Sequence, residues 1–204
     1  MIPISLLSKM CMYEIEIQGG VYVKASVVDR AVLVDAQIAK LRSSFEKPLV
    51  APIVAFDIKC MPNYNGAMLL ILCVGTRCLV IQLYYLDSFP DSIKKFLSDK
   101  NVCFVGIGVK DKVKKILQWP QMFGCETGVE LGHLAARVLK KPNLEGCGLV
   151  ELASEVGVYY ELEEPKSVTF SDWGTRVFSH EQVKYAMHDA YASYLIANNL
   201  LNLL

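Results

Sequence analysis

The sequence predicts an α/β fold with a mixed central sheet, in which three antiparallel strands lead into parallel ones. The chain has 204 residues, 53% of them of apolar types, which is enough for one well-cored domain. Strand patterns joined by turn residues dominate its first half, whereas short apolar runs alternate with helical patterns in its second half. Such alternation implies parallel strands with helical crossovers. No linker, repeat or low-complexity segment interrupts the pattern, so residues 1–204 are predicted to form one domain.

The N-terminal part, residues 1–49, is predicted to contain a β-hairpin and a helix. Residues 11–17 and 21–28 both alternate apolar and polar side chains, and the glycines between them favour a turn. Asp29 stands where a helix N-cap is expected. The predicted apolar face of this helix comprises Val32, Leu33, Ala36, Ile38 and Leu41.

The remaining part, residues 50–204, begins with a buried strand over 53–58. A second hairpin is predicted over 68–74 and 78–84, so the sheet opens with antiparallel pairing. The later elements are predicted as a helix from Ser88-Phe-Pro90-Asp91 to Leu97, strand 102–107, helix 110–118, strand 127–131, helices 131–140 and 147–156, and a long final helix that begins at Ser179 with a Ser179–Gln182 capping box.

The composition limits the classes of function. The 21 basic and 21 acidic residues balance, so a site for nucleic acid has to be local. The seven cysteines are odd in number and lack zinc-ligand spacing, which favours reduced core thiols. No apolar run approaches the ~18 residues of a membrane span, and the N-terminus lacks the basic region of a signal peptide. We expect an intracellular protein of the cytoplasm or nucleus with no membrane partner.

The apolar content also favours self-association. A thoroughly buried sheet accounts for part of the 53% apolar fraction, and an oligomer interface would hide the surplus. The run Leu200-Leu-Asn-Leu-Leu204 is similarly apolar, which suggests burial against a partner subunit. The N-terminal hairpin is a candidate interface if its strands lie at a sheet edge.

Three stretches carry candidate site residues: Asp57-Ile-Lys59, Gly106-Ile-Gly108 through Lys112, and Tyr185-Ala-Met-His-Asp189. The first places its carboxylate and its ammonium two residues apart on one strand, so both point to the same face. The second is a strand that passes through a Gly-x-Gly turn into a helix, and the glycines allow close backbone approach. In the third, the Tyr and the Asp share one helical face.

Taken together, these stretches resemble the three motifs of the RNase D and Werner-type 3′-5′ exonucleases, the tyrosine branch of the DEDD superfamily. The first family motif is Asp-x-Glu; Asp57 matches it, and Lys59 replaces the Glu. The second is Gly-x-Gly-x-x-x-Asp; both glycines match, but Lys112 stands at the Asp position. The third, Tyr-x-x-x-Asp, matches in full at Tyr185 and Asp189.

The resemblance covers about residues 50–200 and is nearest to small plant members, including the RISC-interacting clearing 3′-5′ exoribonucleases. Supporting matches lie at Thr127–Leu139, with Glu130 at a family Asp position, and at Lys166–Trp173. The resemblance implies an RNase H-like, DnaQ-like fold with helices on both faces of the sheet. It also implies hydrolysis of RNA or single-stranded DNA with Mg²⁺ or Mn²⁺. The partners it implies are copies of the chain or active exonuclease relatives, some of which build ring-like oligomers.

Two lysines alter the chemistry that the family site implies. Its four carboxylates supply about −4 to hold two Mg²⁺ ions. Here the four positions are Asp57, Lys59, Lys112 and Asp189, whose formal charges sum to zero. At an effective dielectric of ~20, an ammonium about 4 Å from Mg²⁺ costs about 8 kcal/mol. We therefore expect no cofactor, and Asp57 and Asp189 are metal ligands only if a metal binds at all.

Two arrangements of the lysines stay open. Their ammonium groups could occupy the metal positions and pair with Asp57 and Asp189, or their side chains could extend into solvent. The first is favoured because two unneutralised carboxylates would otherwise share one cleft. A substitute ligand is not expected, because Asp111 lies about 100° round the helix from Lys112. Glu130 could lie near the cleft, but it adds only one carboxylate.

Three residues are candidates for substrate binding. Lys112 and Lys115 belong to a lysine-rich helix, which is typical of a solvated face but could also bind phosphate. His188 follows as a candidate at the cleft rim because it precedes Asp189.

These observations favour a degenerate exonuclease-like protein that is catalytically impaired and serves as an oligomeric interaction or regulatory subunit. One alternative is an active Mg²⁺-dependent 3′-5′ exonuclease acting on RNA or single-stranded DNA, in which Asp57, Tyr185 and Asp189 are joined by a substitute ligand. The other alternative is a metal-free nucleic-acid-binding module.

Overall fold

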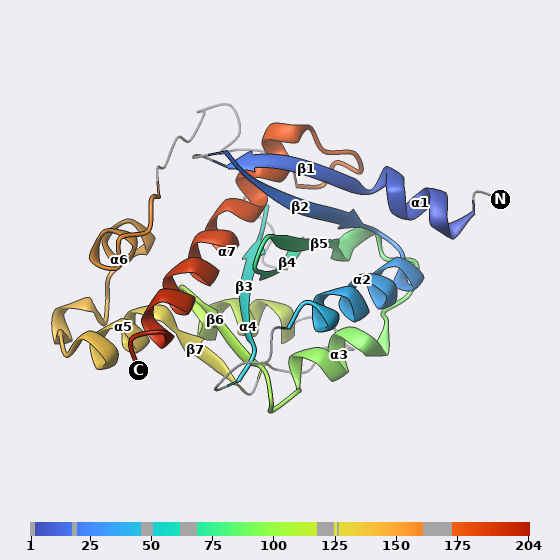
Figure 1. The fold of residues 1–204 in the computed structure, drawn as a ribbon. Helices are drawn as coiled ribbons and strands as arrows, with labels where there is room; N and C mark the ends of the chain where they lie inside the picture. The colour runs from blue at the N-terminus through green and yellow to red at the C-terminus, as the bar shows by residue number, and fades with distance from the viewer. Residues whose placement is uncertain are drawn as a thin grey trace.

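A computed structural model describes residues 3–17, 20–45, 51–61, 69–117, 125, 127–160 and 173–204. Seven strands of the described chain form one sheet, in the spatial order β1-β2-β5-β4-β3-β6-β7 (Figure 1). The strands are β1 (Met12–Ile17), β2 (Val21–Val28), β3 (Ile53–Lys59), β4 (Leu69–Val74), β5 (Arg77–Gln82), β6 (Cys103–Gly106) and β7 (Gly128–Glu130).

The directions of strand pairing confirm the predicted mixed sheet. Strands β3, β4 and β5 are antiparallel neighbours, and β6 and β7 continue from β3 in parallel. The N-terminal hairpin is confirmed too, since β1 and β2 pair antiparallel. Strand β2 also pairs in parallel with β5, a long-range contact that the sequence pattern does not predict. The hairpin therefore extends the sheet at the edge opposite β7.

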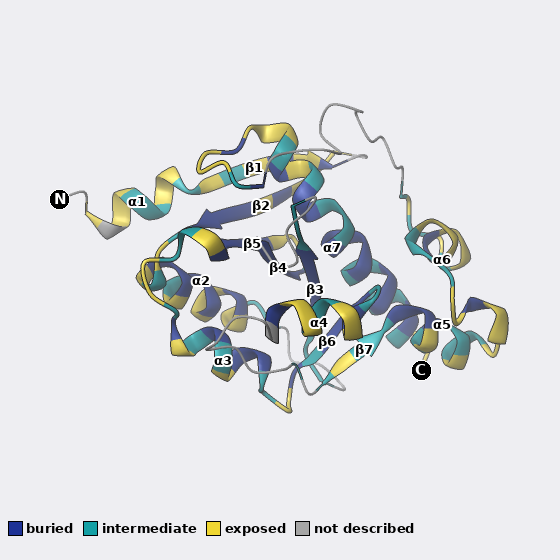
Figure 2. Cartoon of the chain, turned by 180° about the vertical axis from the view of Figure 1, so that it is seen from behind, coloured by how far each residue is buried: buried dark blue, intermediate teal, exposed yellow. Residues whose placement is uncertain are grey.

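Helices cover both faces of the sheet, as predicted (Figures 1 and 2). Helices α5, α6 and α7 pack on one face, here called the α7 face. Helices α2, α3 and α4 pack on the other, the α4 face. The helical segments are α1 (Ile4–Met10), α2 (Ala31–Ser43), η1 (Leu83–Tyr85), α3 (Asp91–Leu97), α4 (Val109–Leu117), α5 (Leu131–Leu139), η2 (Pro142–Leu144), α6 (Leu149–Glu155) and α7 (His180–Leu201).

The predicted cap of α2 is wrong. The side chain of Asp29 makes no cap bond, because it forms an ion pair with Arg176 at 2.9 Å, 147 residues away in sequence. The exposed N–H of Ala31 instead donates to Asp87 Oδ1 at 2.9 Å. A carboxylate still accepts a bond at the helix start, but it comes from a distant segment.

Three local details also differ from the sequence prediction. The buried face of α2 includes Val34, which is fully buried, whereas Val32 is 44% exposed. Helix α3 follows Pro90 without a side-chain cap, so Ser88 does not cap it. The end of the predicted strand 78–84 is a 3-10 turn over Leu83–Tyr85. Helix α1, for which the sequence analysis has no prediction, precedes the first hairpin.

The capping box of α7 is confirmed. Ser179 Oγ accepts a bond from the Gln182 N–H at 3.2 Å, and Gln182 Oε1 accepts one from the Ser179 N–H at 2.9 Å. This box fixes where the longest helix begins. The apolar run at the end of this helix, Leu200–Leu204, is only partly buried. Leu200 is buried in the chain's own core, whereas Leu204 is 81% exposed.

Some predictions fall on residues outside the described ranges. They concern the first hairpin turn at 18–19, the start of the strand at 68, the end of the helix at 118 and the match over 166–172. In the described part of the chain, no helix has both the length and the apolar character needed to cross a membrane.

Candidate functional site

The site begins at the C-terminal end of β3, in the centre of the sheet. Asp57 and Lys59 lie two residues apart, so both side chains point to the α7 face. The Asp57 side chain is 4% exposed and that of Lys59 13%. Lys59 Nζ faces Asp57 Oδ2 at 3.1 Å, in an ion pair without hydrogen-bond geometry.

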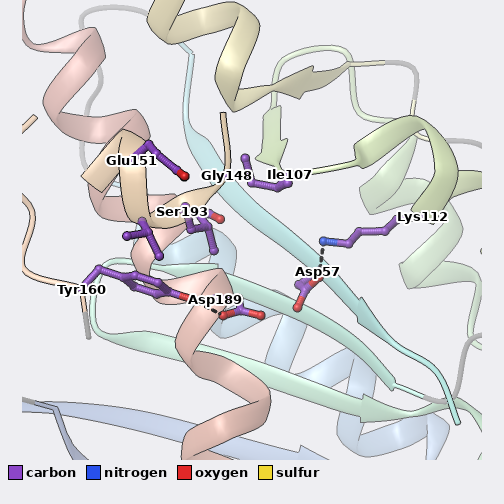
Figure 3. Close-up of a pocket in the computed structure, with 10 residues that line it drawn as sticks. Asp57, Ile107, Lys112, Gly148, Glu151, Tyr160, Asp189 and Ser193 are labelled. Carbon is purple, nitrogen blue, oxygen red and sulfur yellow. Dashed lines mark hydrogen bonds and ion pairs between the residues drawn. The ribbon is translucent and has the colours of Figure 1, made fainter. Parts of the chain in front are cut away.

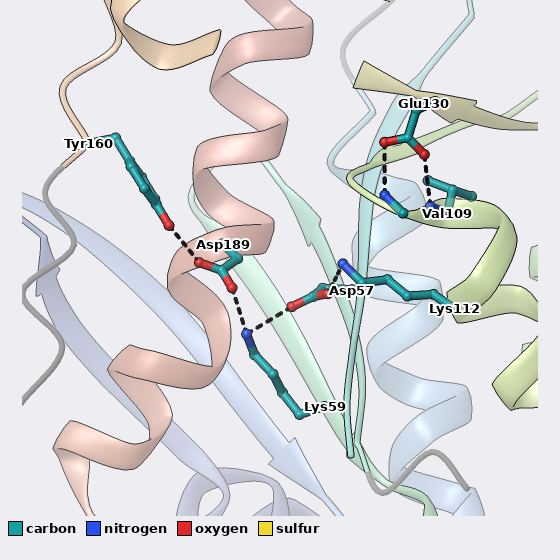
Figure 4. A network of polar contacts seen from close by, with 8 residues as sticks. Asp57, Lys59, Val109, Lys112, Glu130, Tyr160 and Asp189 are labelled. Atoms are coloured by element: carbon teal, nitrogen blue, oxygen red, sulfur yellow. Dashed lines mark hydrogen bonds and ion pairs between the residues drawn. The ribbon is translucent and has the colours of Figure 1, made fainter. Parts of the chain in front are cut away.

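Lys59 also reaches across to α7. Its Nζ donates to Asp189 Oδ2 at 2.6 Å, so one ammonium lies between two carboxylates that are 132 residues apart in sequence (Figure 4). Burial alone lowers the pKa of Lys59, but the charges of Asp57 and Asp189 outweigh this effect and raise it above the ordinary value. Lys59 is therefore a largely buried, charged group whose charge is neutralised by its neighbours.

The second lysine approaches the same carboxylate from α4. Lys112 Nζ lies 2.5 Å from Asp57 Oδ1. Helix α4 can begin this close to β3 because Gly106 has no side chain; a Cβ there would lie 2.5 Å from the carbonyl oxygen of Phe56. Gly108 then turns the chain with φ 63°, a conformation that favours glycine. The expected pairing of the lysines with the site carboxylates is thus observed.

Glu130 holds the start of α4 from the neighbouring strand. Its Oε1 accepts the Gly108 N–H at 2.8 Å, and its Oε2 accepts the Val109 N–H at 3.0 Å (Figure 4). A carboxylate is favoured there because the first N–H groups of a helix lack intrahelical partners and carry partial positive charge. Glu130 does not line the cavity at Asp57 and Asp189, and both its carboxylate oxygens bind the helix start.

Tyr160 completes the site from the segment after α6, and the sequence analysis missed it. Its hydroxyl donates to Asp189 Oδ1 at 2.8 Å, and its ring stacks on His188 with centroids 4.8 Å apart. Burial raises the pKa of Tyr160, and the charge of Asp189 raises it further, so the phenol keeps its proton. Burial also lowers the pKa of His188. No motif spacing points to Tyr160, because its role depends on how α6 packs beside α7.

The tyrosine of the third motif lies beneath the lysine. Lys59 Nζ lies 5.2 Å from the centre of the Tyr185 ring, within the range of a cation–π contact. The Tyr185 ring also stacks on Trp173, nearly parallel and with ring centroids 6.1 Å apart. Trp173 is buried, which agrees with the core position that its size favours.

A cavity of about 330 Å³ remains beside these residues (Figure 3). Its polar lining comes from Asp57, Lys112, Glu151, Asp189 and Ser193, on four elements of the fold. Tyr160 and the apolar start of α6 form other parts of the wall. The described residues thus bring parts of all three motif stretches and α6 around one concave space.

Not every predicted binding residue lies at this cavity. Lys115 is exposed on α4 and is not among its lining residues. His188 contacts Tyr160, which lines the cavity, but is not itself part of the lining. Asp111 points away, as expected, and pairs with Lys114 at 2.9 Å on the surface.

The residues present do not fit a pair of divalent metal ions. Asp57 faces two ammonium groups, and Asp189 accepts bonds from Lys59 and Tyr160. Magnesium needs several oxygen ligands and is repelled by ammonium groups at this range. Among the described residues, no group of three or more His, Cys, Asp or Glu side chains could hold a metal.

Comparison with known proteins links both the sequence and the fold to nucleases. The model of a family described as 3′-5′ exonuclease matches residues 31–204. The mouse bifunctional 3′-5′ exonuclease/ATP-dependent helicase WRN is 29% identical over 157 residues, covering 74% of this chain and 11% of the mouse protein. A 3′-5′ exonuclease of Arabidopsis thaliana is 28% identical over 149 residues, covering 69% of this chain and 50% of the plant protein. The chain spans half or less of the length of these curated relatives.

Solved structures confirm the fold class. Escherichia coli RNase D, an exoribonuclease involved in structured RNA processing, superposes with a TM-score of 0.68 and 16% identity, over 88% of this chain and 44% of RNase D. The EXD2 exonuclease domain soaked in Mg and GMP superposes with a TM-score of 0.51 and 23% identity, over 87% of this chain and 88% of that domain. The shared architecture is the RNase H-like exonuclease fold.

Proposed function

Because this chain belongs to the family of 3′-5′ exonuclease domains, we propose that it is a degenerate member: its lysine-filled site is catalytically impaired, and it acts as an interaction or regulatory subunit. The retained Tyr185 and Asp189, four residues apart on α7, support the tyrosine branch of the family. The proposed partners are further copies of this chain or active exonuclease relatives. A plant source and a cytoplasmic or nuclear location belong to the same proposal.

The ion-pair cluster is the single observation that carries the proposal. Lys59 Nζ contacts Asp57 at 3.1 Å and Asp189 at 2.6 Å, while Lys112 Nζ contacts Asp57 at 2.5 Å. Two ammonium groups and two carboxylates have a formal charge of zero. The site is therefore electrically balanced without metal, and adding two divalent ions would leave about +4 uncompensated.

Exonuclease chemistry of the two-metal type needs more than a fold. One ion activates the attacking water, and the other stabilises the leaving oxygen. A protonated lysine has no lone pair, so it can neither coordinate a metal ion nor accept a proton from the attacking water. The pKa of Lys59 is raised rather than lowered, so this side chain stays protonated. The side chains present can orient a phosphate or a sugar, but they leave the attacking water without activation.

Binding of nucleic acid without cleavage is a second candidate function. The open cavity of about 330 Å³ beside Lys112 supports it, because a space for a ligand remains although the metal ligands have changed. Salt-sensitive affinity for single strands, with no products, would identify this function.

A degradation assay on labelled single-stranded RNA and DNA tests the proposal. The chain is compared with Lys59→Glu/Lys112→Asp, each in Mg²⁺ and in Mn²⁺. We expect the chain to release no products above background. The double variant should release products from the 3′ end at a rate on the order of 10²-fold above that background, because two carboxylates restore the ligand set. Lys95→Glu/Lys114→Asp is the matched control, with the same charge change at exposed positions.

Two results decide against the proposal. Cleavage by the unmodified chain that Asp57→Ala abolishes would mean that another ligand completes a metal site. Equal activation by the control pair would mean that net charge, not the site, limits the reaction.

A further inference from the structure

Three cations meet at one small cavity on the α4 face of the sheet. Helix α2 packs beside strands β2 and β5 (Figure 1), and residues of these three elements line a cavity of about 30 Å³. Lys24 of β2, Lys40 of α2 and Arg77 of β5 are among them, and all three side chains are exposed. The cations lie far apart in sequence, so only the folded chain brings them to one place.

Lys24 and Arg77 lie side by side on the sheet. They are register partners on the parallel strands β2 and β5, and neighbouring strands are ~4.8 Å apart. Both side chains point to the α4 face, because the next residues along the two strands, Ala25 and Cys78, are buried on the α7 face. Like charges at facing positions destabilise a sheet, and an anion between them would remove that cost.

The positive charge of the cluster is not compensated by ion pairs. Among the described residues, none forms an ion pair with Lys24, Lys40 or Arg77. Glu14 stands opposite Lys24 on β1, is exposed and is the one acidic residue that strand register places beside the cluster in the described sheet. Three cations and one carboxylate leave a formal charge of +2 around the cavity.

Two buried polar side chains complete the lining. Ser26 and Gln37 both line the cavity, and each is 6% exposed. Gln37 Nε2 donates to Ser8 Oγ at 3.4 Å. In the described part of the chain, the Ser26 hydroxyl has no hydrogen-bond partner, and it points to the α4 face as Lys24 does. Buried hydroxyl groups are normally hydrogen-bonded, so this one indicates a partner inside the cavity.

The size and charge of the cavity fit a phosphate group. A volume of about 30 Å³ exceeds what one water molecule needs but is too small for a nucleobase. A guanidinium group such as that of Arg77 binds two phosphate oxygens at once, and an ammonium group binds them as a point charge. A serine hydroxyl can donate to a further oxygen.

We propose that this cavity binds a phosphate group, either as inorganic phosphate or as the end of a small phosphomonoester. Arg77 and Lys40 hold its oxygens, the Ser26 hydroxyl donates to it, and Lys24 adds positive charge. The site is separate from the cluster around Asp57, whose side chain points to the α7 face. It therefore goes beyond the proposed function and does not depend on it.

A nuclear magnetic resonance titration of the isotope-labelled chain with inorganic phosphate tests the site. Ionic strength is kept constant with sodium chloride, so that charge screening does not change. We expect saturable shifts of the Lys24 and Ser26 backbone amides and of the Gln37 side-chain amide. Arg77→Gln should raise the Kd for phosphate at least about tenfold, because the bidentate contact is lost. Glu14→Gln should lower this Kd by about twofold or more, because a carboxylate that repels the anion is removed.

Controls separate binding from general charge effects. Arg137→Gln, at an exposed position on α5 with no ion pair among the described residues, should leave the Kd unchanged. Lys40→Gln is a second variant that should weaken binding, and circular dichroism checks that every variant folds. Shifts that do not saturate, that chloride alone reproduces, or that both folded cavity variants leave unchanged overturn the site.

A parallel titration with phenyl phosphate distinguishes the two sources of the phosphate group. Equal binding of both compounds supports a site for phosphomonoesters, whereas binding of inorganic phosphate alone supports a site for the free ion. Absence of binding by both overturns the proposal. The nuclease assay does not involve this cavity, so its result and the result of these titrations are independent.

Discussion

Lys59 is the residue on which the site depends. Its ammonium is held between Asp57 and Asp189 and lies over the ring of Tyr185. Removing one partner of a buried ion pair leaves the other charge uncompensated in a medium that solvates it poorly. Lys59 therefore stabilises the centre of this fold by neutralising the carboxylates of Asp57 and Asp189.

Replacing Lys59 with methionine should destabilise the chain by about 3–5 kcal/mol at neutral pH. Burial raises the pKa of Asp189, but the charge of Lys59, together with hydrogen bonds from Lys59 and Tyr160, lowers it by more, so the pKa is lowered in the folded state. The stability gained from this carboxylate is thus present above its unfolded pKa of about 4 and is lost as the pH falls. The raised pKa of Lys59 acts in the other direction: its contribution is complete below about pH 10 and is lost at higher pH.

Urea unfolding at several pH values measures this effect. The difference between the parent chain and Lys59→Met should be largest near pH 7 and should shrink as the pH falls toward about 3, where the carboxylates take up protons. Lys95→Met, the same substitution at an exposed position, should lower the free energy of unfolding by well under about 1 kcal/mol. A small, pH-independent difference for Lys59→Met would show that the ion pairs contribute little.

At the scale of elements, the start of α4 determines where the second lysine lies. Glu130 binds the first two N–H groups of the turn with both carboxylate oxygens. Lys112 lies one helical turn further along and reaches Asp57. A strand-borne carboxylate thus fixes a helix start, and the helix in turn fixes the ion pair.

Glu130→Gln should weaken the contact between β7 and the start of α4 and lower the free energy of unfolding by about 1–2 kcal/mol. The nitrogen of the neutral amide cannot accept a hydrogen bond, and the favourable negative charge at the helix start is lost. Hydrogen exchange of the Gly108 and Val109 amides should accelerate more than that of amides in the sheet core. Glu145→Gln, at an exposed position, is the matched control. Unchanged exchange at the two amides would assign the role of Glu130 to packing instead.

At the scale of the whole molecule, the balance of charge in the site predicts indifference to divalent metal. Addition of about 10 mM Mg²⁺, or of a chelator, should shift the melting temperature of the parent chain by less than about 1 °C, since a ligand stabilises only what it binds. Lys59→Glu/Lys112→Asp should gain about 2.7 kcal/mol at a Mg²⁺ concentration 100 times its Kd. Differential scanning calorimetry checks both. A rise of several degrees for the parent chain would reveal a metal site that its ligand set does not account for.

The sequence predicts the general architecture well because most of it depends on local pattern. Alternation identifies both hairpins, and the change from strand period to helix period identifies the parallel half of the sheet. The capping box of Ser179 and Gln182 is likewise a short-range signal. Local pattern does not predict the cap of α2, because Asp29 forms an ion pair with the distant Arg176 instead.

The fold class and most of the element order follow from the sequence alone, as do the positions of Lys59 two residues after Asp57 and of Lys112 after the Gly-x-Gly turn. What the two lysines contact becomes clear only from the folded chain. The contacts of Lys59 with Asp189, of Glu130 with the start of α4 and of Tyr160 with Asp189 join residues on different elements, and no local spacing encodes them.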